Sequence, residues 1–166
     1  MWLVYTIEVY FHFNFGVFGI YPRTLTGLIG ILTAPLIHSD ALHLASNTFP
    51  MVFLGATLYL FYSKIASNIF FQCYIFPSIL VWLFGRTSYH IGASGLIYGL
   101  AFFLISFGLF KKDFKSLLIS TVIIIFYGGL FYGVLPVNNG VSWESHLMGA
   151  IVGVATASVY SRFDTN

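Results

Sequence analysis

The sequence predicts an all-α membrane protein, built as a bundle of six transmembrane helices. Its composition is 58% hydrophobic, 20% aromatic and 7% charged, whereas a soluble domain usually carries about 25% charged residues. A chain of this kind cannot cover a water-facing surface. Because a helix needs roughly 20 apolar residues to cross the hydrocarbon core, 166 residues leave room for about six crossings with short loops. We therefore expect one bundle without a separate soluble domain.

Six apolar runs follow one another along the chain and define the expected helices. Most are separated by short polar segments such as SK, GRTSYH, KKDFK and PVNNG. The first run has no basic leader and no cleavage site, so we expect it to stay as a signal anchor. The predicted helices lie in one domain, residues 1–166, and span residues 2–20, 41–62, 67–85, 92–110, 114–135 and 142–161.

The longest connection, residues 21–40, is predicted to be an interfacial loop. It contains Pro22, Pro35, several glycines and Arg23, which break a spanning helix but keep an amphipathic character. We expect this segment to lie in the outer leaflet.

The basic residues predict the orientation of the bundle, because Lys and Arg concentrate in cytoplasmic loops. Only Arg23 and Arg86 belong to the loops on the opposite side. The cytoplasmic set follows the second, fourth and sixth predicted helices and consists of Lys64, Lys111, Lys112, Lys115 and Arg162. We therefore expect an integral, multi-pass protein of the bacterial cytoplasmic (inner) membrane with both termini in the cytoplasm.

Three polar side chains on three different helices share one expected depth. Asn47, Ser94 and His146 each lie 16 or 17 residues before the basic residue that marks the inner end of their helix. At about 1.5 Å per residue this is roughly 25 Å above the inner face. Polar groups are costly at that level and tend to face a bundle interior or a water-filled cavity. Their shared depth indicates a functional site.

Glycines four residues apart form a smooth strip on each of two predicted helices, which permits close backbone approach. Ser94 borders the first strip, and His146 points along the face of the second. Packing strip against strip would bring the two side chains toward hydrogen-bond reach. Plain helix packing is the alternative interpretation of the glycines alone. The two pairs are Gly95 with Gly99, and Gly149 with Gly153.

The serine and histidine predict nucleophilic chemistry. A serine hydroxyl needs a base to take its proton, and a neutral imidazole is suited to that role at neutral pH. Because Ser94 begins its helix, unpaired N–H groups and the helix dipole would lie beside a developing anion, while Gly92 and Gly95 permit the tight turn. No carboxylate stands at an obvious third position, and Glu144 is interpreted as a helix-start or loop residue. The pattern predicts a dyad of Ser94 and His146.

His43 and Asn47 are four residues apart at the start of the second predicted helix, so they share a face and are candidate donors to an oxyanion. His38 precedes them and would complete the polar cluster or support the loop. A membrane-interface histidine is the alternative for His43, and a zinc site is the alternative for the cluster. The HEXXH motif is absent, and the single Cys73 offers no thiol cluster, so no metal site is predicted.

These residues together resemble the rhomboid intramembrane serine proteases. The resemblance rests on HSDALHLASN at 38–47, on GASG at 92–95 with Tyr98, and on Ser145-His146 with the following glycines. It implies a six-helix rhomboid-like core in which Ser94 is the nucleophile and His146 the general base. It also implies an oxyanion hole made by His43, Asn47 and the Ser94 amide, with Tyr98 packed on the imidazole.

The resemblance further implies that helix 114–135 and the PVNNGVSWE loop gate the entry of a substrate helix. One departure concerns the first loop, where the Trp-Arg pair often found in the family is replaced by YPRTLTGL.

The function expected from the sequence is therefore hydrolysis of a peptide bond in or beside a transmembrane segment of another membrane protein. The expected partners are transmembrane protein substrates and membrane lipids, and no cofactor is required. Nucleic acid is not expected, because the net charge of +2 is small and no basic run is interleaved with aromatics. Two alternatives are an inactive rhomboid-like protein that binds membrane clients and a small transporter that uses the polar cavity.

Overall fold

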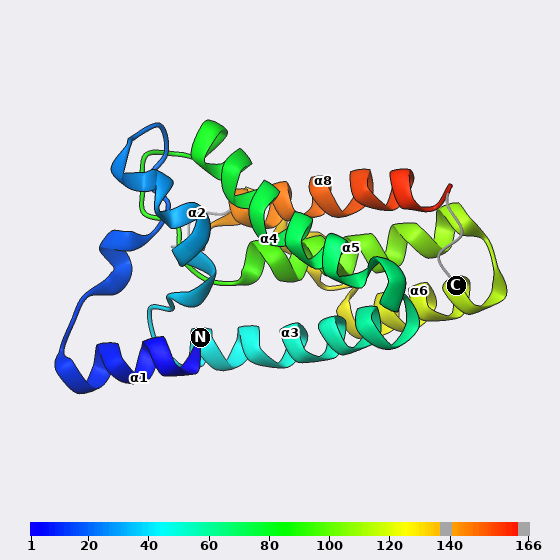
Figure 1. Cartoon of the computed structure of the whole chain (residues 1–166), viewed down its shortest axis with the longest axis horizontal. Helices are drawn as coiled ribbons and strands as arrows, with labels where there is room; N and C mark the ends of the chain where they lie inside the picture. Colours follow the sequence, from blue (N-terminus) through cyan, green and yellow to red (C-terminus); the bar gives the residue numbers. More distant parts are fainter. Residues whose placement is uncertain (137–140, 163–166) are drawn as a thin grey trace.

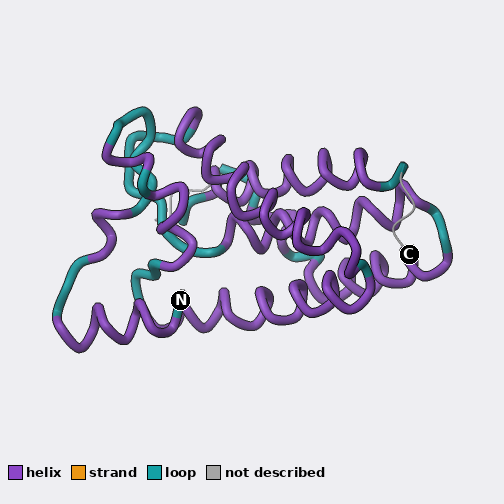
Figure 2. Tube along the Cα trace, viewed as in Figure 1, coloured by secondary structure: helices purple, strands orange, loops and turns teal. Residues whose placement is uncertain are grey.

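Helices predominate in the computed structural model, which describes residues 1–136 and 141–162 (Figure 2). The described part contains no β-strand, only an isolated antiparallel bridge between Ile20 and His90. Short 3-10 turns occur at Phe15–Phe18, Thr26–Leu28 and Ala34–Leu36. The α-helices are α1 (Trp2–Phe11), α2 (Gly30–Thr33), α3 (Ala41–Phe61), α4 (Ser63–Phe84), α5 (Ser94–Lys111), α6 (Phe114–Tyr127), α7 (Leu130–Gly133) and α8 (Trp143–Tyr160).

Three of the described helices, α3, α4 and α5, are long and apolar enough to cross a membrane. The prediction of six crossings is not confirmed by this measure. With 10 and 14 residues, α1 and α6 are shorter than the roughly 20 residues that a crossing takes. The all-helical, membrane-spanning class that the composition predicts is confirmed in this coarser form.

The first predicted helix, residues 2–20, is wrong in its second half. The helix ends at Phe11, and His12 adopts a left-handed conformation with φ 55°. Local polar bonds then redirect the chain: Glu8 Oε1 accepts a hydrogen bond from the Phe15 amide at 2.8 Å, and the Asn14 side chain accepts from the Gly16 amide at 3.0 Å. The left-handed His12 ends the helix, and the Phe13 amide donates to the Glu8 carbonyl at 3.0 Å, although the residues that follow are still apolar.

The predicted loop 21–40 contains short helical turns that are fastened to α4. Trp82 donates from Nε1 to the Thr24 carbonyl at 2.9 Å, and the Tyr74 hydroxyl donates to the Leu32 carbonyl at 2.6 Å. Arg23, with φ 60°, donates to the Gly85 carbonyl at 2.8 Å. The segment is thus tied to the bundle by side chains that donate to backbone carbonyls in both directions.

The remaining helix boundaries shift for local reasons. Helix α4 begins at Ser63 rather than at residue 67, directly after a break at Tyr62. Helix α6 ends at Tyr127 rather than at residue 135, because Gly128 and Gly129 interrupt the helix before α7 begins. This early end places Gly133 outside α6, at the end of the short helix α7.

Helix α5 is the centre of the bundle. Every residue from Gly95 to Gly108 is buried, and the helix contacts α3, α4, α6 and α8. In Figure 1, α3 runs along one side of the molecule and α8 along the other, with α5 between them. Helix α5 is therefore held in place by four neighbouring helices.

The two glycine strips pack against each other, as their spacing predicts. A Cβ atom built on Gly149 would contact the Gly95 carbonyl oxygen, and one built on Gly153 would contact the Gly99 carbonyl oxygen. The same offset at both levels sets a single register of α8 on α5. Close backbone packing of this kind holds helices together where lipid supplies no hydrophobic driving force.

Candidate active site

An open cavity of about 740 Å³ lies among the ends of α3, α5 and α8. Side chains from all three helices line it, so residues far apart in the sequence converge there. The polar residues predicted to share one depth all belong to its wall, together with two further predicted site residues: Asn47, Ser94, His146, His43 and Tyr98.

Ser94 is the first residue of α5 and is half-buried at the cavity wall. The preceding turn depends on Gly92, which has φ 103°, a conformation that side chains rarely adopt. Within the described chain, the amides of Ser94, Gly95 and Leu96 donate no hydrogen bond, as expected at a helix start without a side-chain cap. The site thus offers N–H donors and the positive end of the helix dipole beside the Ser94 hydroxyl.

His146 lies in the first turn of α8 and is oriented from two sides. Its Nδ1 is 2.9 Å from the carbonyl oxygen of Gly133, and its ring stacks on Tyr98 with centroids 4.1 Å apart and planes within 5°. A carbonyl oxygen only accepts, so Nδ1 must carry the hydrogen. In the neutral ring Nε2 is then unprotonated, which is the state a general base requires.

Ser94 and His146 share the cavity wall but do not hydrogen-bond each other. Among the described residues, neither the Ser94 hydroxyl nor Nε2 of His146 has a hydrogen-bond partner. Catalytic hydrogen bonds are often long in ligand-free enzymes and tighten when the substrate binds. Both reactive atoms are therefore unoccupied by competing protein groups.

His43 lies against the turn that precedes Ser94. A Cβ atom on Gly92 would be 2.7 Å from Nε2 of His43, so the Nε2 edge of the imidazole contacts the glycine directly. On the opposite side, Nδ1 is 3.1 Å from the Ser39 hydroxyl, which also reaches Oδ2 of Asp40 at 2.7 Å. The carboxylate only accepts, so the Ser39 hydroxyl hydrogen points to Asp40, and the hydroxyl oxygen accepts from Nδ1–H of His43. In the neutral ring Nε2 then carries no hydrogen.

Asn47 is buried at 5% exposure and lies one turn beyond His43 on the same face of α3. Its Nδ2 donates to the His43 carbonyl at 2.8 Å, which fixes the orientation of the amide group. An amide nitrogen has two hydrogens, so one donor is used within α3 and the second is left for a ligand in the cavity.

Two other predicted residues lie outside the cavity wall. His38 is 2% exposed and meets the His43 ring edge-on with centroids 4.9 Å apart, and neither of its ring nitrogens has a partner among the described residues. Burial, reinforced by the nearby His43, lowers the pKa of His38 to about 4. Glu144 is buried and pairs with Arg86 at 3.4 Å, so its ion-pair partner is Arg86 rather than His146.

No group of three or more His, Cys, Asp or Glu side chains suited to a metal ion occurs within residues 1–136 and 141–162. Cys73 is fully buried in the apolar core, where its side chain packs against Gly99.

Sequence reasoning missed two features of the site. The first is the Gly133 carbonyl, which holds the imidazole; the Gly128-Gly129 pair was the available signal that the helix ends before it. The second is a polar cluster around His90, whose members are far apart in the sequence. Part of the expected gating loop, residues 137–140, lies outside the described residues.

The chain belongs to the rhomboid family: the Rhomboid domain matches residues 26–163. Its relatives include uncharacterized proteins of Mycobacterium tuberculosis and Mycobacterium bovis, each 37% identical over 154 residues, which is 86% of this chain and 63% of the relative. An uncharacterized protein of Mycobacterium leprae is 39% identical over 144 residues, 81% of this chain and 57% of the relative. The chain thus spans about three fifths of the length of these relatives.

Proposed function

We propose that the chain is an intramembrane serine endopeptidase that hydrolyses peptide bonds in or next to transmembrane segments of other membrane proteins. One observation carries the proposal. The bond from Nδ1 of His146 to the Gly133 carbonyl leaves Nε2 as the free basic nitrogen of a ring that shares a cavity with Ser94. Membership of the rhomboid family gives the proposal independent support.

In the proposed reaction, the Ser94 hydroxyl oxygen attacks the scissile carbonyl carbon while Nε2 of His146 takes the hydroxyl proton. The carbon–nitrogen bond then breaks, and the same proton passes from Nε2 to the leaving amine. A water molecule hydrolyses the acyl ester: Nε2 takes a proton from the water and returns it to the Ser94 oxygen. No cofactor enters either half of the reaction.

The negative charge of each tetrahedral intermediate needs hydrogen-bond donors. The free amides at the start of α5 and the second Nδ2 hydrogen of Asn47 are candidate donors. His43 becomes a third donor when the Ser39 hydroxyl turns from Asp40 to Nδ1, which moves the ring hydrogen to Nε2. The stacked Tyr98 ring and the Gly133 carbonyl stabilise the imidazolium that forms when His146 takes the proton. Apart from the His43 ring, these groups are held in place in the ligand-free fold and need little reorganisation.

We further propose that the rhomboid core crosses the membrane six times, with both termini in the cytoplasm of a bacterial cell. In that arrangement the shorter or less apolar helices α1, α6 and α8 also span the bilayer, helped by local thinning of the bilayer and by neighbouring helices. The cavity would then lie toward the outer leaflet, and α6 with the following loop would gate the entry of a substrate helix from the lipid.

The experiment is labelling of the detergent-solubilised protein with a fluorophosphonate probe. We expect labelling of the parent protein and its loss in Ser94→Ala and His146→Ala, with thermal unfolding unchanged. Absence of labelling in well-folded parent protein would favour an inactive membrane-protein binding factor or a small transporter. Labelling that persists in Ser94→Ala would refute the assignment of the nucleophile.

A further inference from the structure

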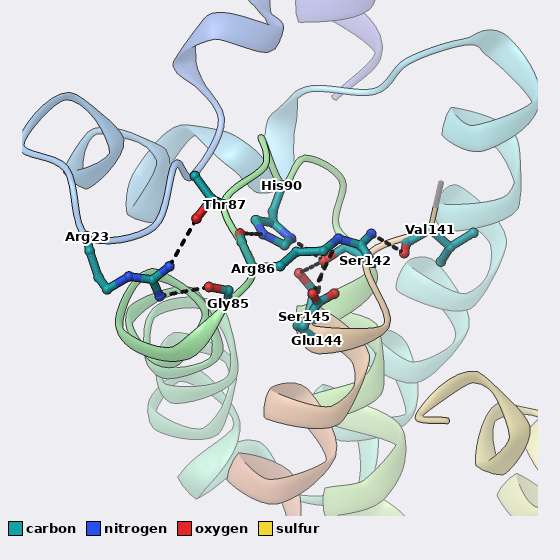
Figure 3. A network of polar contacts seen from close by, with 9 residues as sticks. All are labelled: Arg23, Gly85, Arg86, Thr87, His90, Val141, Ser142, Glu144 and Ser145. Carbon is teal, nitrogen blue, oxygen red and sulfur yellow. Dashed lines mark hydrogen bonds and ion pairs between the residues drawn. The ribbon is translucent and has the colours of Figure 1, made fainter. Parts of the chain in front are cut away.

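A polar cluster beside the cavity joins the α4–α5 loop to the first turn of α8 (Figure 3). The loop contributes Arg86 and His90, and α8 contributes Ser142, Glu144 and Ser145. His90 and Glu144 are 2% and 4% exposed, so this cluster is built into the fold rather than spread on its surface. The proposed mechanism does not use any of these side chains.

The hydrogen bonds of His90 have fixed directions. Nε2 lies 3.0 Å from the Arg86 carbonyl oxygen, which only accepts, so Nε2 carries the hydrogen. In the neutral ring Nδ1 is then an acceptor, and it receives the Ser142 hydroxyl hydrogen across 2.6 Å. The Ser142 oxygen in turn accepts from the Ser145 hydroxyl at 2.7 Å and from the Ser145 amide at 3.4 Å. The neutral Nε2–H tautomer of His90 satisfies all of these bonds.

An ion pair reinforces the same connection. Nε of Arg86 is 3.4 Å from Oε1 of the buried Glu144, and Nη2 of Arg86 donates to the Val141 carbonyl at 2.9 Å. Neither Glu144 oxygen has a hydrogen bond among the described residues, so Arg86 is the group that compensates its charge. A buried carboxylate that loses its cation is strongly unfavourable, which ties α8 to the loop.

The cluster joins the two segments that lead into the residues of the proposed dyad. On the loop side, His90 exchanges two backbone hydrogen bonds with Ile20, at 2.9 and 3.0 Å, and the Gly92 amide donates to the Ala34 carbonyl at 2.9 Å. This fixes the loop that leads into Ser94. On the other side, Ser142 caps α8 in the turn that carries His146.

We propose that His90 is a positioning residue, which together with the Arg86–Glu144 ion pair sets the separation of Ser94 and His146. The inference rests on the proposed function of that dyad. Arg86, His90 and Glu144 do not line the cavity, so their replacement leaves the contacts with a bound substrate unchanged. Their loss acts on the geometry of the reacting groups.

The charged groups around His90 agree with a neutral ring. Burial lowers the pKa of His90, and the Arg86 charge acts in the same direction; the bond to the Arg86 carbonyl and the charge of Glu144 oppose them. The net effect keeps the imidazole neutral at neutral pH. A second proton on Nδ1 would remove the acceptor that Ser142 uses.

The test compares two substitutions of His90. His90→Phe fills the volume but removes both ring hydrogen bonds, whereas Oδ1 in His90→Asn occupies a place near Nδ1 and can accept from Ser142. We expect His90→Phe to lower kcat on a single-span substrate at least about tenfold, with KM nearly unchanged, because misplaced reacting groups lose rate rather than binding. The fluorophosphonate labelling rate of Ser94 should fall in parallel, and His90→Asn should recover most of both.

A matched control separates positioning from stability. Ser120→Ala removes a buried hydrogen bond of 2.8 Å to the Ile105 carbonyl, between α5 and α6 and away from the cavity. It should lower the melting temperature but leave kcat per folded molecule at the parent value. Glu144→Gln is the second variant, should His90→Phe fail to fold, and we expect it to lower kcat about threefold to tenfold.

Hydrogen–deuterium exchange of the amides of residues 143–150 gives a readout that needs no activity. Faster exchange in His90→Phe than in Ser120→Ala supports the inference, even if the parent protein has no Ser94-dependent activity and the proposed function fails. The inference is overturned if His90→Phe keeps the parent kcat per folded molecule in an active parent. It is also overturned if His90→Asn loses as much as His90→Phe, or if exchange in α8 does not change.

Discussion

Replacing Gly149 by alanine is expected to separate α8 from α5 at the level of the proposed dyad. The new Cβ would contact the Gly95 carbonyl oxygen and would lie 2.9 Å from Cβ of Tyr98. Non-bonded carbon atoms pack at roughly 3.5 to 4.0 Å, so the helices must part by about 0.6 to 1 Å. His146 lies one turn from Gly149 and moves with it.

A displacement of this size at the reacting groups costs on the order of 100-fold in turnover. Overpacking of the helix interface should also destabilise the fold, by about 1 to 3 kcal/mol. Cleavage of a fluorogenic single-span substrate in proteoliposomes, normalised to the folded fraction, separates the two effects. We expect kcat to fall by this factor while the protein remains folded at low temperature.

Gly55→Ala is the matched control, because a Cβ atom at this position in α3 has no neighbour within 4 Å. Alanine favours the helix over glycine by about 0.5 to 1 kcal/mol, so this variant should be at least as stable as the parent and equally active. A Gly149→Ala protein that cleaves as fast as Gly55→Ala would refute the argument that the glycine register aligns Ser94 with His146.

Three further predictions concern the surroundings of the dyad. Tyr98→Ala should lower turnover about tenfold to a hundredfold because the imidazole loses its stacking partner, and Tyr98→Phe, which keeps the ring, should lose less; kcat on the same substrate measures both. His43→Ala and Asn47→Ala should each lower turnover about 100-fold to 1000-fold if they donate to the oxyanion, and unchanged rates in both would remove α3 from that role. Lowering the pH from 6.5 toward 4 should reduce the melting temperature, because the unfolded chain protonates His38 near 6.5 while the folded chain does so only near 4. This contribution to the free energy of unfolding is present above about pH 6.5 and is lost as the pH falls toward 4. A His38→Phe protein whose melting temperature falls with pH by the same slope would contradict this.

The sequence was sufficient where spacing determines geometry. Four-residue spacing puts Gly95 with Gly99 on one face, and Gly149 with Gly153 on another, so the mutual packing of the two strips followed from periodicity alone. Counting residues from the basic helix ends likewise predicted that Asn47 lies at the same depth as Ser94 and His146, and all three residues line one cavity.

The sequence was insufficient where a backbone group or a local bond decides the structure. Every residue has a carbonyl, so nothing in the residue type of Gly133 indicates that it binds His146. In the first helix, hydropathy continues past Phe11, but the left-handed conformation of His12 ends the helix there, with backbone amides bonded to the Glu8 carbonyl. Hydropathy measures the cost of burial and does not register such a capping interaction.

The cluster around His90 shows a third limit. Arg86 entered the sequence argument as a marker of membrane orientation, and Glu144 as a helix-start residue. Their pairing depends on how the α4–α5 loop packs on the start of α8, which no local pattern encodes. The residues that support a site are therefore found only after the fold has brought them together.

The most direct measurement of the central claim is a double-mutant cycle on Ser94 and His146 with purified protein in proteoliposomes. We expect Ser94→Ala and His146→Ala each to abolish Ser94-dependent cleavage of a single-span substrate, and the double variant to be no worse than either single one, because the two residues act as one unit. A double variant that loses activity by the product of the two single effects, or a His146→Ala protein that still cleaves at the parent rate, would contradict the dyad.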